Sequence, residues 1–266
     1  MKIIVLGKDI SGLLAMYSAY MQDNGVGLAM FTPYHDFGGR PLILRPTLNE
    51  LIPAAVPSLG RLAQMREIRL VPSGSAENWP DKVGRPDKTP ERFPAEPETF
   101  FAYPADEAFH HLLELLGNRI YAGDFTSAGL DAIVDQMTPD LLINTMPMGD
   151  LCRRPDDHGF TRRQFWTSSR IGPSIDDDTI MLNSEDAPAW YCSSKIGGSL
   201  VTKWLIKPPF SDMVDTSLPQ FTNCDCAPHG MIHVGAEATF NPLATLLDVY
   251  SDTAAAVMRT KEGQRS

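Results

Sequence analysis

The sequence KIIVLGKDISGLLAMYSAY, residues 2–20, decides the fold that we expect for this chain of 266 residues. Residues 2–6 form an apolar, β-branched run with the length of a buried strand, and they lead directly into a turn bounded by Gly7 and Gly12. Residues 13–20 are apolar and rich in helix formers, and residues 26–31 form a second strand-like run. This order predicts the strand–turn–helix–strand unit that opens a doubly wound nucleotide-binding fold.

The turn between Gly7 and Gly12 is a candidate phosphate site. The N–H groups at the start of a helix, with the partial positive charge of the helix end, suit a pyrophosphate. Gly7 and Gly12 fill the first and third positions of the dinucleotide fingerprint G-x-G-x-x-G, but Asp9 replaces the middle glycine. Asp9 places a carboxylate where an anion should lie. The acidic residue expected after the second strand is also missing, since Thr32 stands there and Asp36 comes late.

Composition limits the class of protein. The hydrophobic fraction of 43% is enough for a substantial core, and the length allows one or two domains. A net charge of −10 argues against direct, tight binding to a nucleic acid backbone. We expect no membrane span, because no apolar run reaches the roughly 18 residues that a transmembrane helix needs. The four cysteines form no dense disulfide framework, so we expect a reduced, cytoplasmic protein.

The rest of the chain continues the alternation of strands and helices, with an irregular insert. We predict helices at residues 105–116 and 127–137, a buried parallel strand at 140–145, and a last strand at 231–235. A final helix at residues 243–258 follows, with Asn241 as its N-cap. Between them, the runs from residue 160 to 205 resemble an antiparallel meander, and residues 208–228 a loop-rich return.

The predicted fold class is therefore α/β, a Rossmann-type parallel sheet with a smaller, mostly antiparallel β second domain. We expect the dinucleotide-binding domain to comprise residues 1–45, 105–150 and 229–262. We expect a substrate or cap subdomain to comprise residues 46–104 and 151–228. Residues 73–97 within it are rich in Pro, Gly and charged side chains, which indicates an exposed loop.

Three separated segments together resemble one known family. The first is the strand and turn that end at Gly12, the second is PDLLINTMP at residues 139–147, and the third is HVGAEA at residues 233–238. Their order is similar to that of the FAD-dependent amine oxidase and UDP-galactopyranose mutase superfamily. The resemblance covers about half of the chain and implies a short, divergent member that binds FAD.

The resemblance also implies a role for individual residues, although it assigns no catalytic residue. Those at the pyrophosphate would be Gly7, Asp9, Ile10, Ser11 and Gly12. Thr32 would lie near the adenosine ribose, and Gly38, Gly39 and Arg40 along the cofactor. Thr145 and Pro147 would lie near the flavin, and the pyrophosphate–ribityl end would meet Gly235, Glu237 and Asn241.

Two other clusters invite a metal interpretation. Thiolates and imidazole suit zinc, so Cys224, Cys226 and His229 were considered as ligands. Their spacing is not that of a usual zinc finger and a fourth ligand would be distant, so we predict loop cysteines and no metal site. Residues 176–178 are three consecutive aspartates, which we interpret as a charged turn rather than a cation site.

The first functional hypothesis is a FAD-binding oxidoreductase or a flavin-dependent lyase that acts on an amine or amino-acid-like substrate with a C–N bond. A narrower form has a modified nucleobase of viral DNA as the substrate. A second hypothesis, favoured by Asp9, is a cofactor-free Rossmann-like binding or regulatory protein. A third is an NAD(P)-dependent dehydrogenase, which the late strand–glycine–helix segment disfavours.

Overall fold

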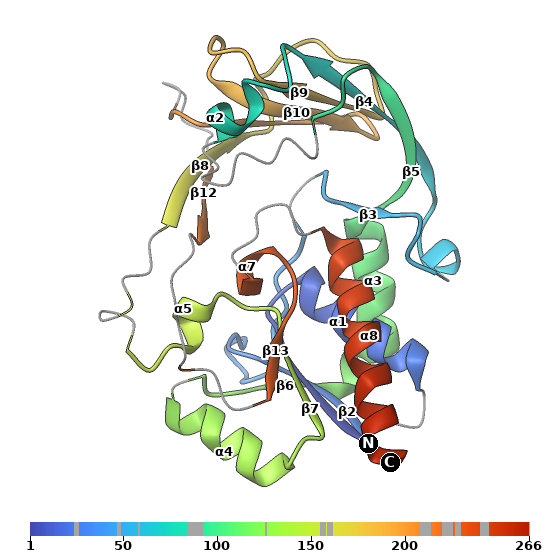
Figure 1. Ribbon diagram of the computed structural model, residues 1–266, viewed down its shortest axis with the longest axis vertical. Coiled ribbons are helices and arrows are strands. Elements are labelled where there is room, and N and C mark those ends of the chain that lie inside the picture. Colours follow the sequence, from blue (N-terminus) through green and yellow to red (C-terminus); the bar gives the residue numbers. More distant parts are fainter. Residues whose placement is uncertain are drawn as a thin grey trace.

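The computed structural model folds into two sheets with helices around the first (Figure 1). It describes residues 1–266 except 24–26, 47–48, 58, 84–92, 126, 155–157, 159–161, 208–213, 220–225, 227–229, 240–244 and 266. The first sheet has five strands in the order β13-β7-β1-β2-β6, and all of its pairs are parallel. These strands are β1 (Lys2–Leu6), β2 (Gly27–Thr32), β6 (Ile120–Ala122), β7 (Leu141–Asn144) and β13 (Met231–His233). The parallel sheet confirms the predicted fold class.

The apolar run of β1 is explained by helices on both faces of this sheet. Ile3 and Val5 enter one core cluster, whereas Ile4 and Leu6 enter another. The first cluster packs under α1 (Ile10–Gln22), α3 (Ala105–Leu116) and α8 (Leu246–Arg265), and the second under α4 (Ser127–Met137) and the short α5 (Met148–Leu151). A strand covered on both faces has no reason to alternate apolar and polar residues.

The second sheet has eight strands in the order β12-β8-β11-β10-β9-β4-β5-β3. Its neighbours are antiparallel except for β4 and β9, which are parallel. The strands from the predicted meander are β8 (Arg162–Ser168), β9 (Thr179–Asn183), β10 (Trp190–Ile196) and β11 (Ser199–Trp204). The other four are β3 (Leu51–Pro53), β4 (Arg66–Ser73), β5 (Glu98–Pro104) and β12 (Val214–Pro219). The strand β12 was not predicted, and it lies inside the expected loop-rich return.

The predicted helices α3 and α4 have the expected bounds, but α8 does not. It begins at Leu246 and continues to Arg265, beyond the predicted end at residue 258. Its first turn is closed by Thr245 and Asp248: the Asp248 N–H donates to Thr245 Oγ1 at 3.3 Å, and the Thr245 hydroxyl donates to Asp248 Oδ2 at 2.7 Å. The predicted N-cap, Asn241, lies outside the described residues. Lys261 holds the last turns by contacting the Gln22 carbonyl at 3.0 Å.

The segment predicted to be an exposed loop, residues 73–97, is not simply exposed. It contains the short helix α2 (Trp79–Val83), and the buried rings of Trp79 and Phe93 lie 5.2 Å apart. Lys82 is also buried, and its ammonium donates to the carbonyl of Pro188 at 2.9 Å. Burial lowers the pKa of Lys82. Among the described residues of this segment, two aromatic rings and one lysine are therefore buried.

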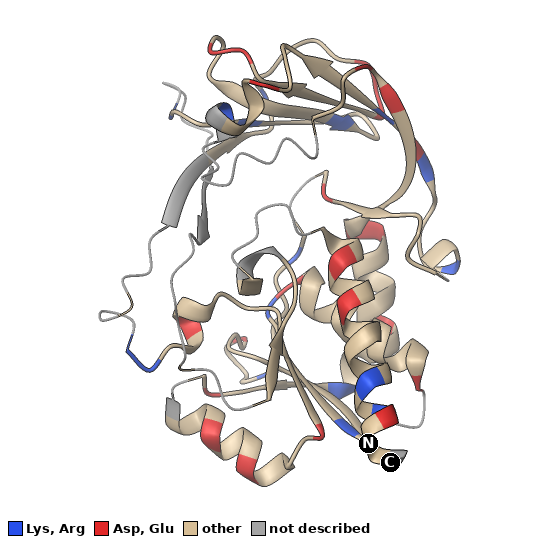
Figure 2. Cartoon of the chain, in the orientation of Figure 1, with Lys and Arg blue, Asp and Glu red and all other residues tan. Residues whose placement is uncertain are grey.

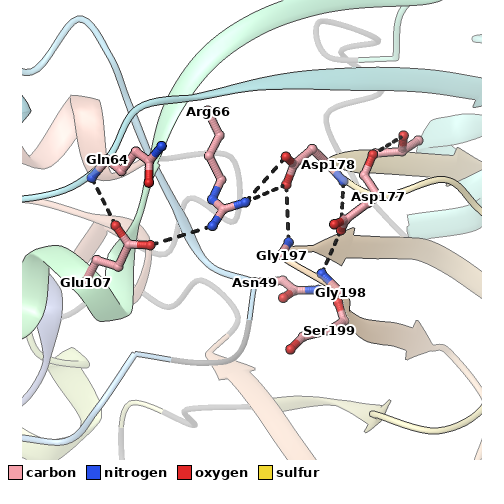
Figure 3. A network of polar contacts seen from close by, with 10 residues as sticks. Asn49, Gln64, Arg66, Glu107, Asp177, Asp178, Gly197, Gly198 and Ser199 are labelled. Atoms are coloured by element: carbon pink, nitrogen blue, oxygen red, sulfur yellow. Dashed lines mark hydrogen bonds and ion pairs between the residues drawn. The ribbon is translucent and has the colours of Figure 1, made fainter.

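A polar network joins α3 to the second sheet (Figure 3). Arg66 on β4 lies 3.8 Å from Glu107 on α3 and 3.4 Å from Asp178, which precedes β9. Asp178 in turn accepts the Gly197 N–H at 3.2 Å, at the two-residue turn between β10 and β11. Both ion pairs are partly exposed, so each contributes at most about 1 kcal/mol. The network orients the second sheet over the first more than it stabilises either. Asp177 and Asp178 thus lie in a charged turn, as expected.

Candidate functional site

The carboxyl ends of the five parallel strands lie at one edge of the first sheet. From β1 the chain moves to β2 and β6 on one side, and it returns to β7 and β13 on the other. The strand order therefore reverses between β1 and β7, the place where open α/β sheets bind ligands. Backbone hydrogen bonds align this edge: Gly7 N–H donates to Phe31 at 3.0 Å, Thr145 N–H to Leu6 at 2.9 Å, and Val234 N–H to Asn144 at 2.9 Å.

The two glycines of the first turn are required by packing. A Cβ on Gly7 would lie 2.7 Å from Gly12 Cα and 2.9 Å from Thr145 Oγ1. A Cβ on Gly12 would lie 2.5 Å from Met30 Cε. The start of α1 is thus pressed against β1 and β2, which is the close helix–strand contact that the dinucleotide fingerprint reserves for glycine.

Asp9 is the N-cap of α1. Its Oδ1 accepts the Ser11 N–H at 2.9 Å, and the residue is in the extended conformation that a cap adopts. A phosphate oxygen that accepted this same N–H would occupy the position of Oδ1. The carboxylate therefore competes with an anionic ligand for the start of the helix, which is the consequence expected for an aspartate at the middle position of the fingerprint.

Thr32 ends β2 and is buried at the same edge, but its hydroxyl is committed to the protein. It donates to the Leu42 carbonyl at 3.0 Å, and Leu44 N–H donates to the Lys8 carbonyl at 2.7 Å. Residues 42–44 therefore run alongside the glycine turn. The hydrogen bond explains why a threonine takes the place of the acidic residue that the fingerprint expects: it anchors the returning chain.

Gly38, Gly39 and Arg40 lie at the exposed tip of a hairpin beyond β2 and not at the strand edge itself. Gly39 has a φ of +74°, and Asp36 Oδ1 accepts the N–H groups of Gly38 and Arg40 at 2.9 Å each. These bonds, that of Arg40 first, hold the pKa of the Asp36 carboxyl below its usual range. The two glycines serve this turn, and their contact with a cofactor stays a prediction.

After β7 the chain reaches the edge through a buried polar cluster that the sequence analysis did not single out. Asn144 Oδ1 accepts the Met146 N–H at 2.9 Å, so its amide nitrogen faces His233 Nδ1, 3.1 Å away on β13. Because the amide nitrogen is a donor, Nδ1 must be unprotonated. Burial lowers the pKa of His233 in agreement with this neutral form. An asparagine inside the apolar run LLIN was the signal available in the sequence.

The remaining predicted residues flank this cluster. The Thr145 hydroxyl donates to the Leu6 carbonyl at 3.1 Å, and Pro147 precedes the first turn of α5. Gly235 has a φ of +86°, and a Cβ there would lie 2.9 Å from Val249 Cγ2 on α8. Glu237 belongs to the short helix α7 (Ala236–Thr239), but its side chain, like the whole of Asn241, lies outside the described part of the chain.

A cavity of about 370 Å³ opens between the glycine turn and the second sheet. Ser11 forms part of one wall, and the facing wall comes from β5, β9, β10 and β11. The residues of that wall are Phe100, Ile180, Cys192, Ser194 and Lys203. Asn49 and Glu50 close a third side, and the start of α8 a fourth. This volume is within the usual range of ligand pockets, about 300–1,000 Å³. The sequence analysis assigned none of these residues except Ser11.

Asn49 fixes the geometry of this cavity. Its side-chain amide donates to the carbonyls of Ser194 at 2.9 Å and Ser199 at 2.8 Å (Figure 3 labels Asn49 and Ser199). Asn49 has a φ of +63°, a conformation that asparagine tolerates better than most residues. The chain before β3 is thereby tied to the β10–β11 hairpin. The wall of the cavity is preorganised by protein contacts.

Comparisons with known proteins identify the fold. No family model matches the sequence, and no curated protein matches it. Solved structures match over nearly the whole chain. The 2,6-dihydroxypyridine-3-hydroxylase of Arthrobacter nicotinovorans is 13% identical with a TM-score of 0.50, covering 98% of this chain and 82% of its own. The 2-methyl-3-hydroxypyridine-5-carboxylic acid oxygenase is 11% identical with a TM-score of 0.51, and the match covers 98% of this chain and 81% of its own. BrvH, a flavin-dependent halogenase from Brevundimonas sp. BAL3, is 10% identical with a TM-score of 0.50, and the match covers 98% of this chain and 71% of its own.

At such identities these likenesses show the fold alone. The chain therefore has the two-sheet architecture of a flavin-dependent halogenase and of two enzymes that act on pyridine rings. The narrower resemblance to the amine oxidase and UDP-galactopyranose mutase superfamily stays a prediction. None of the helices in the described part of the chain is both long and apolar enough to cross a lipid bilayer.

Proposed function

We propose that this chain is a FAD-dependent oxidoreductase. One observation carries the proposal: Ser11 belongs both to the glycine turn at the switch point and to the wall of the cavity between the sheets. A dinucleotide whose diphosphate lay against residues 7–12 would therefore have a cavity within reach for its reactive ring. Gly7, Gly12, Thr145 and Gly235 are the residues that would frame it.

The residues fit FAD at this turn, with one conflict. The glycines let the start of α1 pack closely against β1 and β2, and the helix start favours an anion. The Asp9 carboxylate must leave the Ser11 N–H before a phosphate oxygen can accept it. Losing a cap costs about 1 kcal/mol, and the incoming anion would satisfy the same N–H in its place. FAD supplies the electron-transfer chemistry when bound, and the protein orients it and excludes water.

The substrate that we propose is an amine or an amino-acid-like compound with a C–N bond, which is oxidised or cleaved. Glu50 and Lys203 both line the cavity, so a zwitterionic amino acid derivative would meet one group of each sign. A modified nucleobase is the narrower alternative. Figure 2 shows acidic residues along α3 and α4, and the net charge is −10, so such a base would have to be presented without tight contact to a nucleic acid backbone. A reduced, cytoplasmic setting belongs to the same proposal.

The test is a visible absorption spectrum of the purified protein, followed by titration of the apoprotein with FAD. We expect flavin bands, release of FAD on denaturation, and re-binding that a Gly12→Asp variant abolishes. Asp135→Asn, on α4 at the opposite edge of the sheet, is the control that should bind as the wild type does. A colourless protein that takes up no FAD when it is supplied in excess would contradict the proposal.

A second candidate function is favoured by Asp9 itself. A carboxylate that already satisfies the helix start, as seen at Ser11, suits a Rossmann-like protein that has lost its cofactor and binds or regulates a partner. This alternative predicts no FAD uptake, and the same titration decides between the two. Titration with NAD(P)H instead of FAD addresses the third possibility, a nicotinamide-dependent dehydrogenase.

A further inference from the structure

Two thiols and an imidazole meet where two of the connections between the sheets, β7 to β8 and β12 to β13, lie side by side. Cys152 follows α5 on the way from β7 to β8, and Cys226 lies between β12 and β13 on the way back. His158 belongs to the first connection. One potential ligand atom from each of the three residues lies within 4.8 Å of the other two. The three residues are half-buried, and Cys226 is remote in sequence from the other two.

The distances match those of a metal centre. His158 Nδ1 lies 3.2 Å from Cys152 Sγ and 3.8 Å from Cys226 Sγ. In a tetrahedral zinc site with Zn–S of about 2.3 Å and Zn–N of about 2.0–2.1 Å, the S···N edge is about 3.6 Å. The two observed distances lie on either side of this value. Both S···N distances therefore fit a shared ion after shifts of a few tenths of an ångström, and all three atoms lie within 4.8 Å of one another.

The surrounding backbone supports a thiolate. The Arg154 N–H points at Cys152 Sγ, 3.3 Å away, and donates to the sulfur. The His158 N–H donates to the Arg154 carbonyl at 3.1 Å. Arg153 pairs with Asp131 on α4, so the start of this connection is anchored to the first domain. The geometry is held by contacts other than the sulfur–nitrogen contacts themselves.

We propose that Cys152, His158 and Cys226 bind a zinc ion, with a water molecule as the fourth ligand of the tetrahedron. Two sulfur ligands and one imidazole suit zinc better than a hard cation such as Mg²⁺ or Ca²⁺. The ion would fasten the outgoing connection to the returning one, close to the parallel sheet. The set differs from the one considered from sequence: it shares only Cys226 with that cluster, because Cys152 and His158 are remote in sequence. Cys224 and His229 lie outside the described residues.

The wild-type protein tests this directly. Elemental analysis after purification without added metal should give about one zinc per chain. Replacement of zinc by Co²⁺ should produce thiolate-to-cobalt charge-transfer absorption, which no binding through nitrogen and oxygen alone can give. Removal of the ion with a strong chelator should lower the thermal midpoint by at least about 4 °C, because the ion binds the folded chain only. A protein that purifies without zinc and acquires no such absorption with Co²⁺ would overturn the proposal.

Variants assign the ligands. Cys152→Ser and Cys226→Ser should each lose at least nine-tenths of the bound zinc, whereas Cys192→Ser, at a thiol on β10 outside this cluster, should retain it. Full zinc content in Cys152→Ser would overturn the assignment. Mass spectrometry of the alkylated, non-reduced protein detects the competing arrangement: a Cys152–Cys226 disulfide in zinc-free protein would also overturn it. None of these readouts depends on flavin binding, so the outcome is independent of the proposed function.

Discussion

Replacing Asp9 by asparagine is expected to tighten the binding of FAD without loss of fold stability. Asparagine caps a helix about as well as aspartate does, so the contact with the Ser11 N–H, now 2.9 Å, should persist in the free protein. The substitution removes the negative charge of the carboxylate. A displaced carboxylate about 4 Å from a phosphate would cost about 1 kcal/mol in water and about 4 kcal/mol near a protein surface. Asp9 is half-exposed, so we expect the dissociation constant to fall about 5-fold to 50-fold.

The assay is quenching of flavin fluorescence during titration of the apoprotein, with thermal unfolding measured in parallel. Asp9→Ala separates the two roles of the side chain, because it removes both cap and charge. It should bind FAD more tightly than the wild type but lose about 1 kcal/mol of unfolding free energy. Asp135→Asn removes a charge at the far edge of the sheet and should change neither quantity. Equal FAD affinity in Asp9→Asn and the wild type would refute the placement of the diphosphate at this turn.

Three further outcomes follow from the edge of the sheet. Gly12→Ala places a Cβ 2.5 Å from Met30 Cε and should weaken FAD binding at least about 10-fold, and Met30→Ala in the same chain should restore part of it by titration. The free energy of unfolding, measured in urea, should fall as the pH drops below about 6.5, because burial lowers the pKa of His233 and the unfolded chain therefore binds one more proton. His233→Gln should reduce this dependence of the unfolding free energy on pH, whereas His111→Gln, at an exposed position, should not. Gly235→Ala, at a φ of +86°, should lose about 1–2 kcal/mol in the same measurement, and an unchanged midpoint would contradict the strained backbone.

The elements that local patterns specify could be predicted from the sequence. The apolar run of β1, and the 3.6-residue periodicity of α3 and α4, each determine an element without reference to the rest of the chain. For β1, α3 and α4 the predicted bounds are those of the structure, and for β7 they differ by one residue at each end.

The parts that could not be predicted depend on contacts between distant segments. β3 and β12 are short or polar strands that exist because a neighbouring strand pairs with them. The role of Asn49 appears only when the β10–β11 hairpin lies beside it. The proposed metal cluster is the clearest case: Cys152 and His158 lie beside Cys226 in the structure, but they precede it by about 70 residues in the sequence. Spacing along the chain is a guide to ligands only where the ligands share one turn or hairpin.

The short helix α5 links the two proposed sites. Lys8, inside the glycine turn, lies 3.8 Å from Asp150 on α5, and α5 ends directly before Cys152. An ion pair with side chains 13% and 34% exposed contributes at most about 1 kcal/mol, which is about a 5-fold change in an equilibrium constant. If removal of zinc broke this ion pair completely, the dissociation constant of FAD should therefore rise about 5-fold and no more. A larger effect would mean that the ion acts on the cavity by another route, through the β7–β8 and β12–β13 connections to the second sheet.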